Sequence, residues 1–288
     1  MNGTRMPLVR TVRLSGGLQL ELGRKTLIMG ILNATPDSFS DGGSYDSVQA
    51  AVNRARQMVD EGADLIDIGG ESTRPGFEPV PGEEELSRVI PVIRAVREAL
   101  PHVPLSIDTY KAETARQSLA AGAHIINDIW ALRFDSGEMA KVAAEFNCPL
   151  ILNHNRPDRN YTNLIADVID DLQESVRIAQ AAGVSNDQIW LDPGIGFAKD
   201  YDENIAMMGR LSDLAALGYP VLLGTSRKGF IGQALGGVPS SDRVEGTAAT
   251  VVLGIAQGCG IVRVHDVKAM KRAAAMADAI VYRDRQHG

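Results

Sequence analysis

The stretch LSIDTYKAETARQSLAAGAHIIND, residues 105–128, contains the structural unit that decides the fold. It opens on a short apolar run that ends at Asp108, continues with helical spacing over 111–121, and reaches Gly122, a residue typical of helix C-termini. A second apolar run, 125–126, then ends at Asn127-Asp128. Both runs are short and lack alternation, as strands buried on both faces do. The stretch therefore predicts strand, helix and parallel strand.

The same unit recurs along the chain of 288 residues. Apolar runs occupy 27–32, 65–68, 105–107, 125–126, 150–152, 189–191, 221–223 and 261–264. Helical patterns occupy 47–61, 84–99, 111–121, 138–146, 163–182, 202–217, 243–257 and 267–282. Residues 8–23 read as a hairpin that turns at Ser15-Gly16-Gly17. Eight strands alternating with eight helices favour a (β/α)8 TIM barrel with a short N-terminal β-hairpin over the alternative, a doubly wound open sheet.

Length and composition exclude several classes of protein. We expect one domain over 1–288, in which residues 1–25 form the hairpin and close the bottom of the barrel. The net charge of −7 argues against a general nucleic-acid surface. No apolar run reaches the length of a membrane span, and residues 1–10 lack the apolar core of a signal peptide. Cys148 and Cys259 form no metal-ligand spacing, which fits a reducing cytoplasm.

Polar residues follow or end every apolar run, where the active sites of such barrels lie. They are Asn33, Asp67, Asp108, Asn127-Asp128, Asn153-His154-Asn155, Asp192, Ser226-Arg227-Lys228, and Arg263 with His265. Any one of them could simply cap a helix, but all of them together indicate a site.

The residue types at these positions indicate two kinds of ligand group. Asp108, Asn127 and Asp192 suit the edge of a heterocycle that is rich in N–H and C=O groups. Lys228, Arg263 and His265 suit a phosphate or a carboxylate. Two long Gly-rich loops, 33–43 and 69–77, also carry Ser, Thr and Asp or Arg side chains, and we interpret them as mobile lids over this face rather than plain connectors.

Seven segments resemble the dihydropteroate synthase family. The two loops, ILNATPDSFSDGG at 31–43 and DIGGESTRPG at 67–76, look like its signatures. Further matches are SIDTYK at 106–111, IINDIW at 125–130, LDPGIGFAK at 191–199, LGTSRK at 223–228 and VRVHDV at 262–267. A single short motif often matches by chance, but seven in the family's order, from about residue 26 to the end of the chain, do not.

The resemblance implies a cytoplasmic TIM-barrel transferase of folate biosynthesis, usually a homodimer. It would join 6-hydroxymethyl-7,8-dihydropterin diphosphate to p-aminobenzoate, with sulfonamides as competitive inhibitors. The implied pterin pocket comprises Asp108, Asn127, Asp192, Lys228 and Arg263. The implied diphosphate site comprises Asn33, Arg74, Arg263 and His265, with Mg²⁺ held by Asn33 and Asp41. The implied p-aminobenzoate site comprises Phe39, Thr73, Pro75, Phe197, Lys228 and Gly229. The implied catalytic residues are Asn33, Arg74, Asp108, Lys228, Arg263 and His265.

The mechanism that we expect is a dissociative, SN1-like displacement. Mg²⁺, Arg263, His265 and Asn33 would stabilise the leaving diphosphate, and Asp108 and Asp192 would favour a cationic pterin CH₂ group. Closed lids would exclude water, which would otherwise capture the cation.

Two positions depart from the family pattern. Asn153 stands where the family often has Met, which would alter the packing below the pterin. Gly229 stands where it often has Ser or Arg, which removes a side-chain contact to the p-aminobenzoate carboxylate, although the N–H groups of a helix start could replace it.

Two other functions are the alternatives. A methyltetrahydrofolate-binding methyl-transfer domain would need neither residues 226–228 nor 73–75, and it would need a corrinoid partner. A non-catalytic pterin-binding paralogue predicts losses at Asn33, Arg74, Lys228, Arg263 or His265, and all of these are present.

Overall fold

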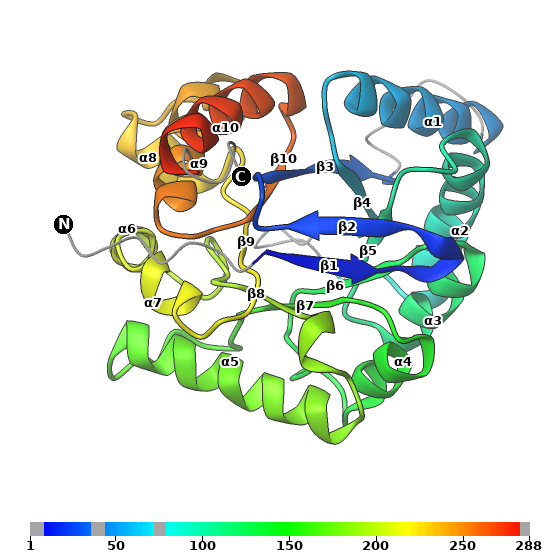
Figure 1. Cartoon of the computed structure of the whole chain (residues 1–288), viewed down its shortest axis with the longest axis horizontal. Coiled ribbons are helices and arrows are strands. Elements are labelled where there is room, and N and C mark those ends of the chain that lie inside the picture. The colour runs from blue at the N-terminus through cyan, green and yellow to red at the C-terminus, as the bar shows by residue number, and fades with distance from the viewer. Residues whose placement is uncertain (1–8, 36–43, 72–78, 283–288) are drawn as a thin grey trace.

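A computed structural model of the chain describes residues 9–35, 44–71 and 79–282 (Figure 1). Within these residues, parallel strands form one eight-stranded sheet in the order β8-β7-β6-β5-β4-β3-β10-β9. They are β3 (Leu27–Asn33), β4 (Leu65–Gly69), β5 (Leu105–Asp108), β6 (Ile125–Asp128), β7 (Leu150–Asn153), β8 (Ile189–Asp192), β9 (Leu222–Leu223) and β10 (Ile261–Val264). Each predicted apolar run coincides with one of these strands.

The two ends of the sheet meet beside β9. Leu191 of β8 forms a parallel bridge with Val221, and its N–H donates to the carbonyl of Pro220 at 2.9 Å. Eight strands thus form a nearly closed barrel, so the predicted TIM barrel is confirmed and the open, doubly wound sheet is wrong.

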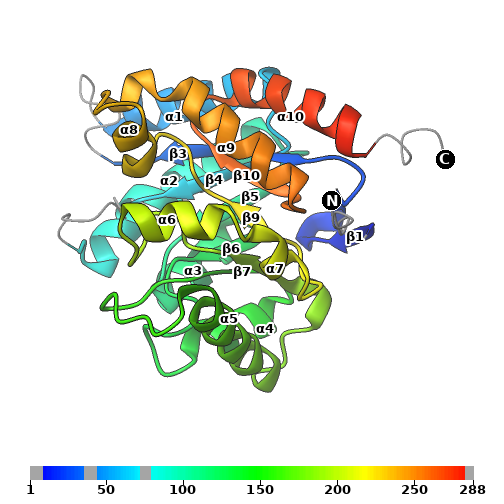
Figure 2. The same cartoon turned by 90° about the vertical axis from the view of Figure 1, so that its left-hand side faces the viewer.

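Helices surround the barrel (Figures 1 and 2). In the described part of the chain they are α1 (Ser44–Asp60), α2 (Gly82–Ala99), α3 (Ala112–Ala121), α4 (Glu138–Phe146), α5 (Leu164–Ala181), α6 (Tyr201–Met208), α7 (Leu211–Ala215), α8 (Gly229–Ala234), α9 (Val244–Ala256) and α10 (Val267–Val281), with short 3-10 turns at Ser15–Gly17, Asn186–Gln188 and Ser240–Asp242. None of these helices is long and apolar enough to cross a membrane.

The helix predicted over 202–217 is wrong as a single element. Gly209 ends α6, and Arg210, with φ −130° and ψ 21°, leaves the helical region before α7 begins. The apolar spacing continues through this break because Leu211 and Leu214 are buried like Met207. Glycine is a weak helix former, and only that residue signals the interruption. The short helix α8 was not predicted, because six residues are too few for a clear period.

The predicted hairpin is confirmed as β1 (Arg10–Arg13) paired antiparallel with β2 (Gln19–Leu22). Gly16 and Gly17 turn the chain with φ of 66° and 77°, a region that disfavours residues with a Cβ. The buried hairpin side chains are Val12, Leu14, Leu20 and Leu22, and they cluster with strand residues Leu27, Met29, Leu65, Ile125, Ile151, Trp190, Leu222 and Ile261. The prediction of one domain over 1–288 is not tested by this packing.

Because side chains alternate along a strand, residues two positions beyond this apolar layer also face the barrel interior. In five strands these residues are polar: Asp67, Asn127, Asn153, Asp192 and Arg263. We call them, together with Asp108 of β5, the polar layer. The interior therefore changes from apolar at the hairpin end to polar at the C-terminal ends of the strands.

The close packing of β4 on α2 gives a first prediction. A methyl group on Gly70 would lie 2.7 Å from Cγ1 of Val89 and 3.2 Å from the main-chain oxygen of Glu85. We expect Gly70→Ala to lower the free energy of unfolding by about 1–3 kcal/mol, measured by urea denaturation. Gly82→Ala is the matched control, because its methyl group would meet only Cδ of Lys111 at 3.8 Å. Equal stability of the two variants would contradict the prediction.

Candidate functional site

Arg263 of β10 reaches across the barrel interior to two carboxylates. Its Nε donates to Oδ2 of Asp67 at 2.6 Å, and its NH2 donates to Oδ2 of Asp108 at 2.6 Å. Asn127 donates from Nδ2 to the same Asp67 oxygen at 3.1 Å. Strands β4, β5, β6 and β10 thus contribute one side chain each to a single network, although β10 is adjacent to none of the other three.

The charges in this network are unbalanced, because two buried carboxylates face one guanidinium. Burial raises the pKa of Asp108 to about 7, with Arg263 opposing the rise and Asp67 adding to it. Burial also disfavours the charge of Arg263, but the two carboxylates raise the pKa of that side chain above its usual value. Arg263 therefore stays charged, and Asp108 exchanges its proton near neutral pH.

Three oxygens of the polar layer accept no hydrogen bond from any described residue. They are Oδ1 of Asp67, Oδ1 of Asp108 and Oδ1 of Asn153. A buried acceptor without a donor costs about 1–3 kcal/mol, so these atoms favour a ligand that presents N–H groups. Asn153 pairs in register with Asp192 on the neighbouring strand, so the departure from Met at this position adds an acceptor to the polar layer.

The space beside Gly224 is bordered by Asp192, Arg263 and Lys228. A methyl group there would lie 3.7 Å from Oδ2 of Asp192, 3.9 Å from Cβ of Arg263 and 4.0 Å from Nζ of Lys228. Burial lowers the pKa of Lys228 to about 8, and Asp192 opposes this shift. Lys228 also donates to the carbonyl of Ile195, and its Nζ lies 4.7 Å from the ring centroid of Phe197.

The segment before α8 is anchored to the end of β10. Ser226 accepts at Oγ from the main-chain N–H of His265 at 3.1 Å and contacts Nδ1 of the same residue at 3.0 Å. Arg227 donates to Asp266 from Nε at 2.8 Å. Lys228 then caps α8, and a methyl group on Gly229 would meet no atom within 4 Å. These contacts place Lys228, Gly229 and His265 on the same rim.

The remaining predicted residues differ in how far the structure places them. Asn33 ends β3 and is partly exposed on the same rim, outside the network of Arg263. The predictions for Phe39, Asp41, Thr73, Arg74 and Pro75 lie outside the described residues.

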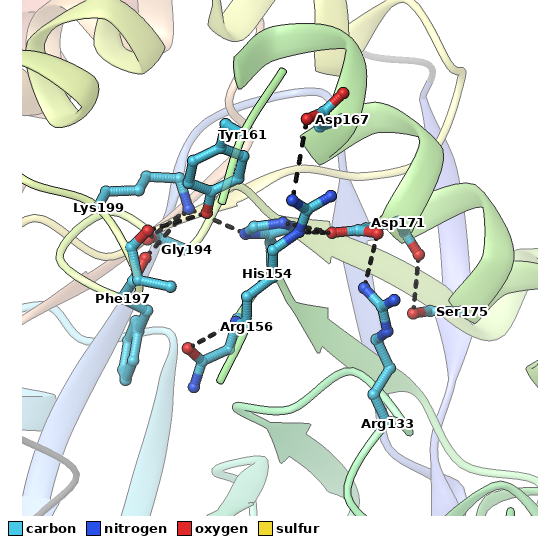
Figure 3. A network of polar contacts seen from close by, with 12 residues as sticks. Arg133, His154, Arg156, Tyr161, Asp167, Asp171, Ser175, Gly194, Phe197 and Lys199 are labelled. Atoms are coloured by element: carbon cyan, nitrogen blue, oxygen red, sulfur yellow. Dashed lines mark hydrogen bonds and ion pairs between the residues drawn. The ribbon is translucent and has the colours of Figure 1, made fainter. Parts of the chain in front are cut away.

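The structure adds contacts that sequence reasoning did not predict. Asp67 was placed on the rim but given no ligand group, and it lies fully buried inside the apolar run of β4, so the signal for its role was an acid within a strand. A second network, behind β7, joins His154 and Lys199 to Asp171 of α5 (Figure 3). Beside it, between the loops after β6 and β7, lies a cavity of about 430 Å³. It is lined by Trp130, Arg133, Phe134, Asn155, Arg156, Pro157, Asp158 and Asn160. Of the polar residues predicted on the rim, Asn155 lines this cavity, and none of the residues predicted to bind a substrate does.

Fold and site together define a barrel enzyme whose mouth suits a polar heterocycle with an anionic group, and comparison with known proteins agrees. The model of the family described as pterin binding enzyme matches residues 29–265. A dihydropteroate synthase of Bacillus subtilis is 58% identical over 268 residues, which cover 93% of each chain. The chain therefore belongs to the pterin-binding enzyme family and, within it, to the dihydropteroate synthases, which are transferases.

Solved structures extend this likeness to the fold. The dihydropteroate synthase of Clostridium difficile, solved with pteroic acid, is 49% identical with a TM-score of 0.88, covering 91% of this chain and 98% of its own. The dihydropteroate synthase of Xanthomonas albilineans, solved with 4-aminobenzoic acid, is 43% identical with a TM-score of 0.88, covering 94% and 98%.

Removing Asp67 tests the central network. Asp67→Ala would leave Nε of Arg263 and Nδ2 of Asn127 without their shared acceptor. We expect a loss of about 2–4 kcal/mol in the free energy of unfolding, measured by urea denaturation. Glu113→Ala, which removes an exposed acid on α3, serves as the control and should change stability by less than about 0.5 kcal/mol. A stable Asp67→Ala variant would show that Asp108 alone suffices to hold Arg263.

Proposed function

We propose that this chain condenses 6-hydroxymethyl-7,8-dihydropterin diphosphate with p-aminobenzoate to give 7,8-dihydropteroate and diphosphate. One observation supports this most strongly. The buried carboxylates and amides of the polar layer, several with unpaired oxygens, share one barrel mouth with Arg263 and Lys228. A heterocycle rich in N–H groups would donate to the unpaired oxygens, and an anionic substituent on it would bind the two cations.

The pterin would enter the polar layer. Asp108, Asn127 and Asp192 would accept from and donate to its N–H and C=O edge, and Asn153 would add a further acceptor. Lys228 and Arg263 line the same space, since both lie beside Gly224. The unpaired Oδ1 atoms of Asp108 and Asn153 would thereby gain donors, which favours binding.

The diphosphate would extend from the pterin toward Asn33, Arg263 and His265, and Asn33 would help to hold Mg²⁺. The residues fit that ion in a limited way: Asn33 offers an amide oxygen, and no cluster of three or more His, Cys, Asp or Glu occurs among the described residues. Mg²⁺ commonly binds through one or two protein oxygens, substrate phosphates and water, so Asn33 with the predicted Asp41 would be enough. When bound, the ion supplies charge stabilisation of the leaving group.

The p-aminobenzoate would lie against Phe197 and Lys228, close to Gly229. The ammonium of Lys228 over the Phe197 ring provides an apolar wall beside a cation, which suits an aromatic carboxylate. Because α8 has only six residues, its first N–H groups rather than its dipole would meet the carboxylate near Gly229. Sulfonamides, as analogues of this substrate, would compete for the same place.

The mechanism that we propose is dissociative. Arg263 and His265 would stabilise negative charge on the departing diphosphate, while Asp108 and Asp192 would stabilise positive charge on the pterin CH₂ group. The amine of p-aminobenzoate would then attack this carbon and lose a proton afterwards, so no general base is required. Exclusion of water by loops 33–43 and 69–77, and a cytoplasmic location, both stay predictions.

The activity test measures diphosphate release from 6-hydroxymethyl-7,8-dihydropterin diphosphate and Mg²⁺, with and without p-aminobenzoate. We expect amine-dependent release with formation of dihydropteroate. Lys228→Ala and Arg263→Ala should each lower kcat/KM by about 10²–10³, because each removes a preorganised cation from the site. Lys141→Ala, an exposed lysine of α4, is the matched control and should turn over normally. Pterin binding without amine-dependent release would instead indicate a non-catalytic paralogue.

We also propose a homodimer formed through α9 and α10. These helices pack side by side, and they expose Val252, Leu253, Met276 and Ile280. Four large apolar side chains on two adjacent helices form a patch that a second copy could cover.

Leu253→Glu tests this patch, because it would place a charge in the proposed dimer interface. We expect the wild type to sediment as a dimer and the variant as a monomer in analytical ultracentrifugation. Phe134→Glu is the matched control, since Phe134 and Leu253 are each 57% exposed but Phe134 lies on the loop after β6. A dimeric Leu253→Glu variant would exclude this interface.

A further inference from the structure

Lys199 is a buried lysine that the proposed mechanism does not use. It lies at the end of the loop between β8 and α6, residues 193–200, and only 8% of it is exposed. Its Nζ lies 2.9 Å from Nδ1 of His154, 3.1 Å from the carbonyl oxygen of Gly194 and 3.2 Å from that of Phe197 (Figure 3). One ammonium group therefore contacts two carbonyls of its own loop and the side chain of His154, directly after β7.

The partners of His154 determine the direction of these hydrogen bonds. Nε2 of His154 lies 3.0 Å from Oδ2 of Asp171. Hydrogen bonds from His154, Arg156 and Arg133 hold the pKa of Asp171 below its usual value, although burial opposes this. An ionised carboxylate only accepts, so Nε2 of His154 donates to it. Burial lowers the pKa of His154 to about 4, so the ring is neutral at pH 7 and Nδ1 is an acceptor for Lys199.

Lys199 thus faces three acceptors, and only its protonated form has three N–H donors for them. Burial lowers the pKa of Lys199 to about 7, and Asp192 opposes this shift, so the protonated form is populated at neutral pH. His154 and Asp171 anchor this ammonium to β7 and α5. The loop is thereby tied to the rigid barrel through a side chain rather than through main-chain pairing.

The loop needs such anchors because its backbone is unfavourable. Gly194, Gly196 and Ala198 have φ of 68°, 83° and 45°, and the last of these is strained for a residue with a Cβ. Tyr161 donates to the carbonyl of Ala198 at 2.9 Å. Contacts from Lys199 to the carbonyls of Gly194 and Phe197, and from Tyr161 to that of Ala198, therefore help to hold this conformation.

The same loop carries two groups of the proposed p-aminobenzoate site. The Phe197 ring lies beside Nζ of Lys228, and the carbonyl of Ile195 accepts from that same ammonium. Asp192, by contrast, lies at the end of β8 and is placed by the strand ladder. Movement of the loop would displace Phe197 and Lys228 most. Asp192 would keep its main-chain position on β8, although its Oδ1 accepts from the N–H of Gly194 in the loop at 2.7 Å.

We propose that Lys199 is a positioning residue for the second substrate: anchored by His154 and Asp171, its ammonium holds the β8–α6 loop so that Phe197 and Lys228 form the p-aminobenzoate site. This inference rests on the proposed function, because it names what shapes one half of that site. It predicts a larger effect on the aryl amine than on the pterin, since strands place the residues of the polar layer and the loop adds one hydrogen bond to it, from Gly194 to Asp192.

The test is Lys199→Met, which keeps the length of the side chain and removes its donors. We expect KM for p-aminobenzoate to rise about tenfold, as loss of a charge-assisted hydrogen bond implies, and kcat to change by less than about threefold. The dissociation constant of the pterin diphosphate, measured by calorimetry, should change by less than about twofold. Lys141→Met, at an exposed lysine of α4, is the matched control.

Tyr161→Phe provides a second measurement on the same loop. It removes the donor to Ala198 without changing any charge, and we expect KM for p-aminobenzoate to rise about threefold with unchanged pterin affinity. This variant decides the question if Lys199→Met does not fold.

Three outcomes would overturn the inference. An unchanged KM for p-aminobenzoate in a folded Lys199→Met variant would overturn it, and so would an equal loss of pterin affinity, which would indicate general loosening of the barrel mouth. A wild-type chain that forms no dihydropteroate would sink the proposed function, and the inference with it. A wild type that turns over normally beside an unaffected variant removes only the role of Lys199.

Discussion

The barrel mouth depends on one guanidinium held between two buried carboxylates. Arg263 satisfies Asp67 and Asp108 through two of its N–H groups. A guanidinium has five N–H donors, so three are left to face a ligand. The carboxylates therefore fix the orientation of Arg263 and leave its other donors for a ligand. Burying these three charged groups costs desolvation energy, so the triad is a weak source of stability. Its benefit is that it provides a preorganised site for an anion.

The triad is possible only because the barrel interior is divided into two layers. Below it, the apolar layer and the hairpin side chains Val12, Leu14, Leu20 and Leu22 form a closed cluster. Above it, the next inward residues of the same strands are polar. Successive inward-facing residues of one strand thus have different roles. Those near the hairpin form the hydrophobic core, and those at the C-terminal end of the strand form the candidate site.

The fold could be predicted because each strand and most helices have a local sequence signal, in eight apolar runs and the periodic segments between them. The rim residues could be predicted for the same reason. Their partners could not, because Arg263 and Asp67 are separated by 196 positions and meet only after the barrel closes. Asp67 was placed on the rim, but its role as a partner of Arg263 was not predicted. Lys199 was overlooked because its partners, His154 and Asp171, lie on two other elements.

Asp192 connects the two halves of the site through charge. Burial lowers the pKa of both Lys199 and Lys228, and in each case Asp192 opposes the shift. One carboxylate therefore helps to keep two lysines protonated, Lys199 within the β8–α6 loop and Lys228 before α8. A pterin that donates a hydrogen bond to Asp192 would interact with the same carboxylate as these two lysines. Occupation of the polar layer and the shape of the loop are consequently linked by electrostatics, without any contact between the pterin and Lys199.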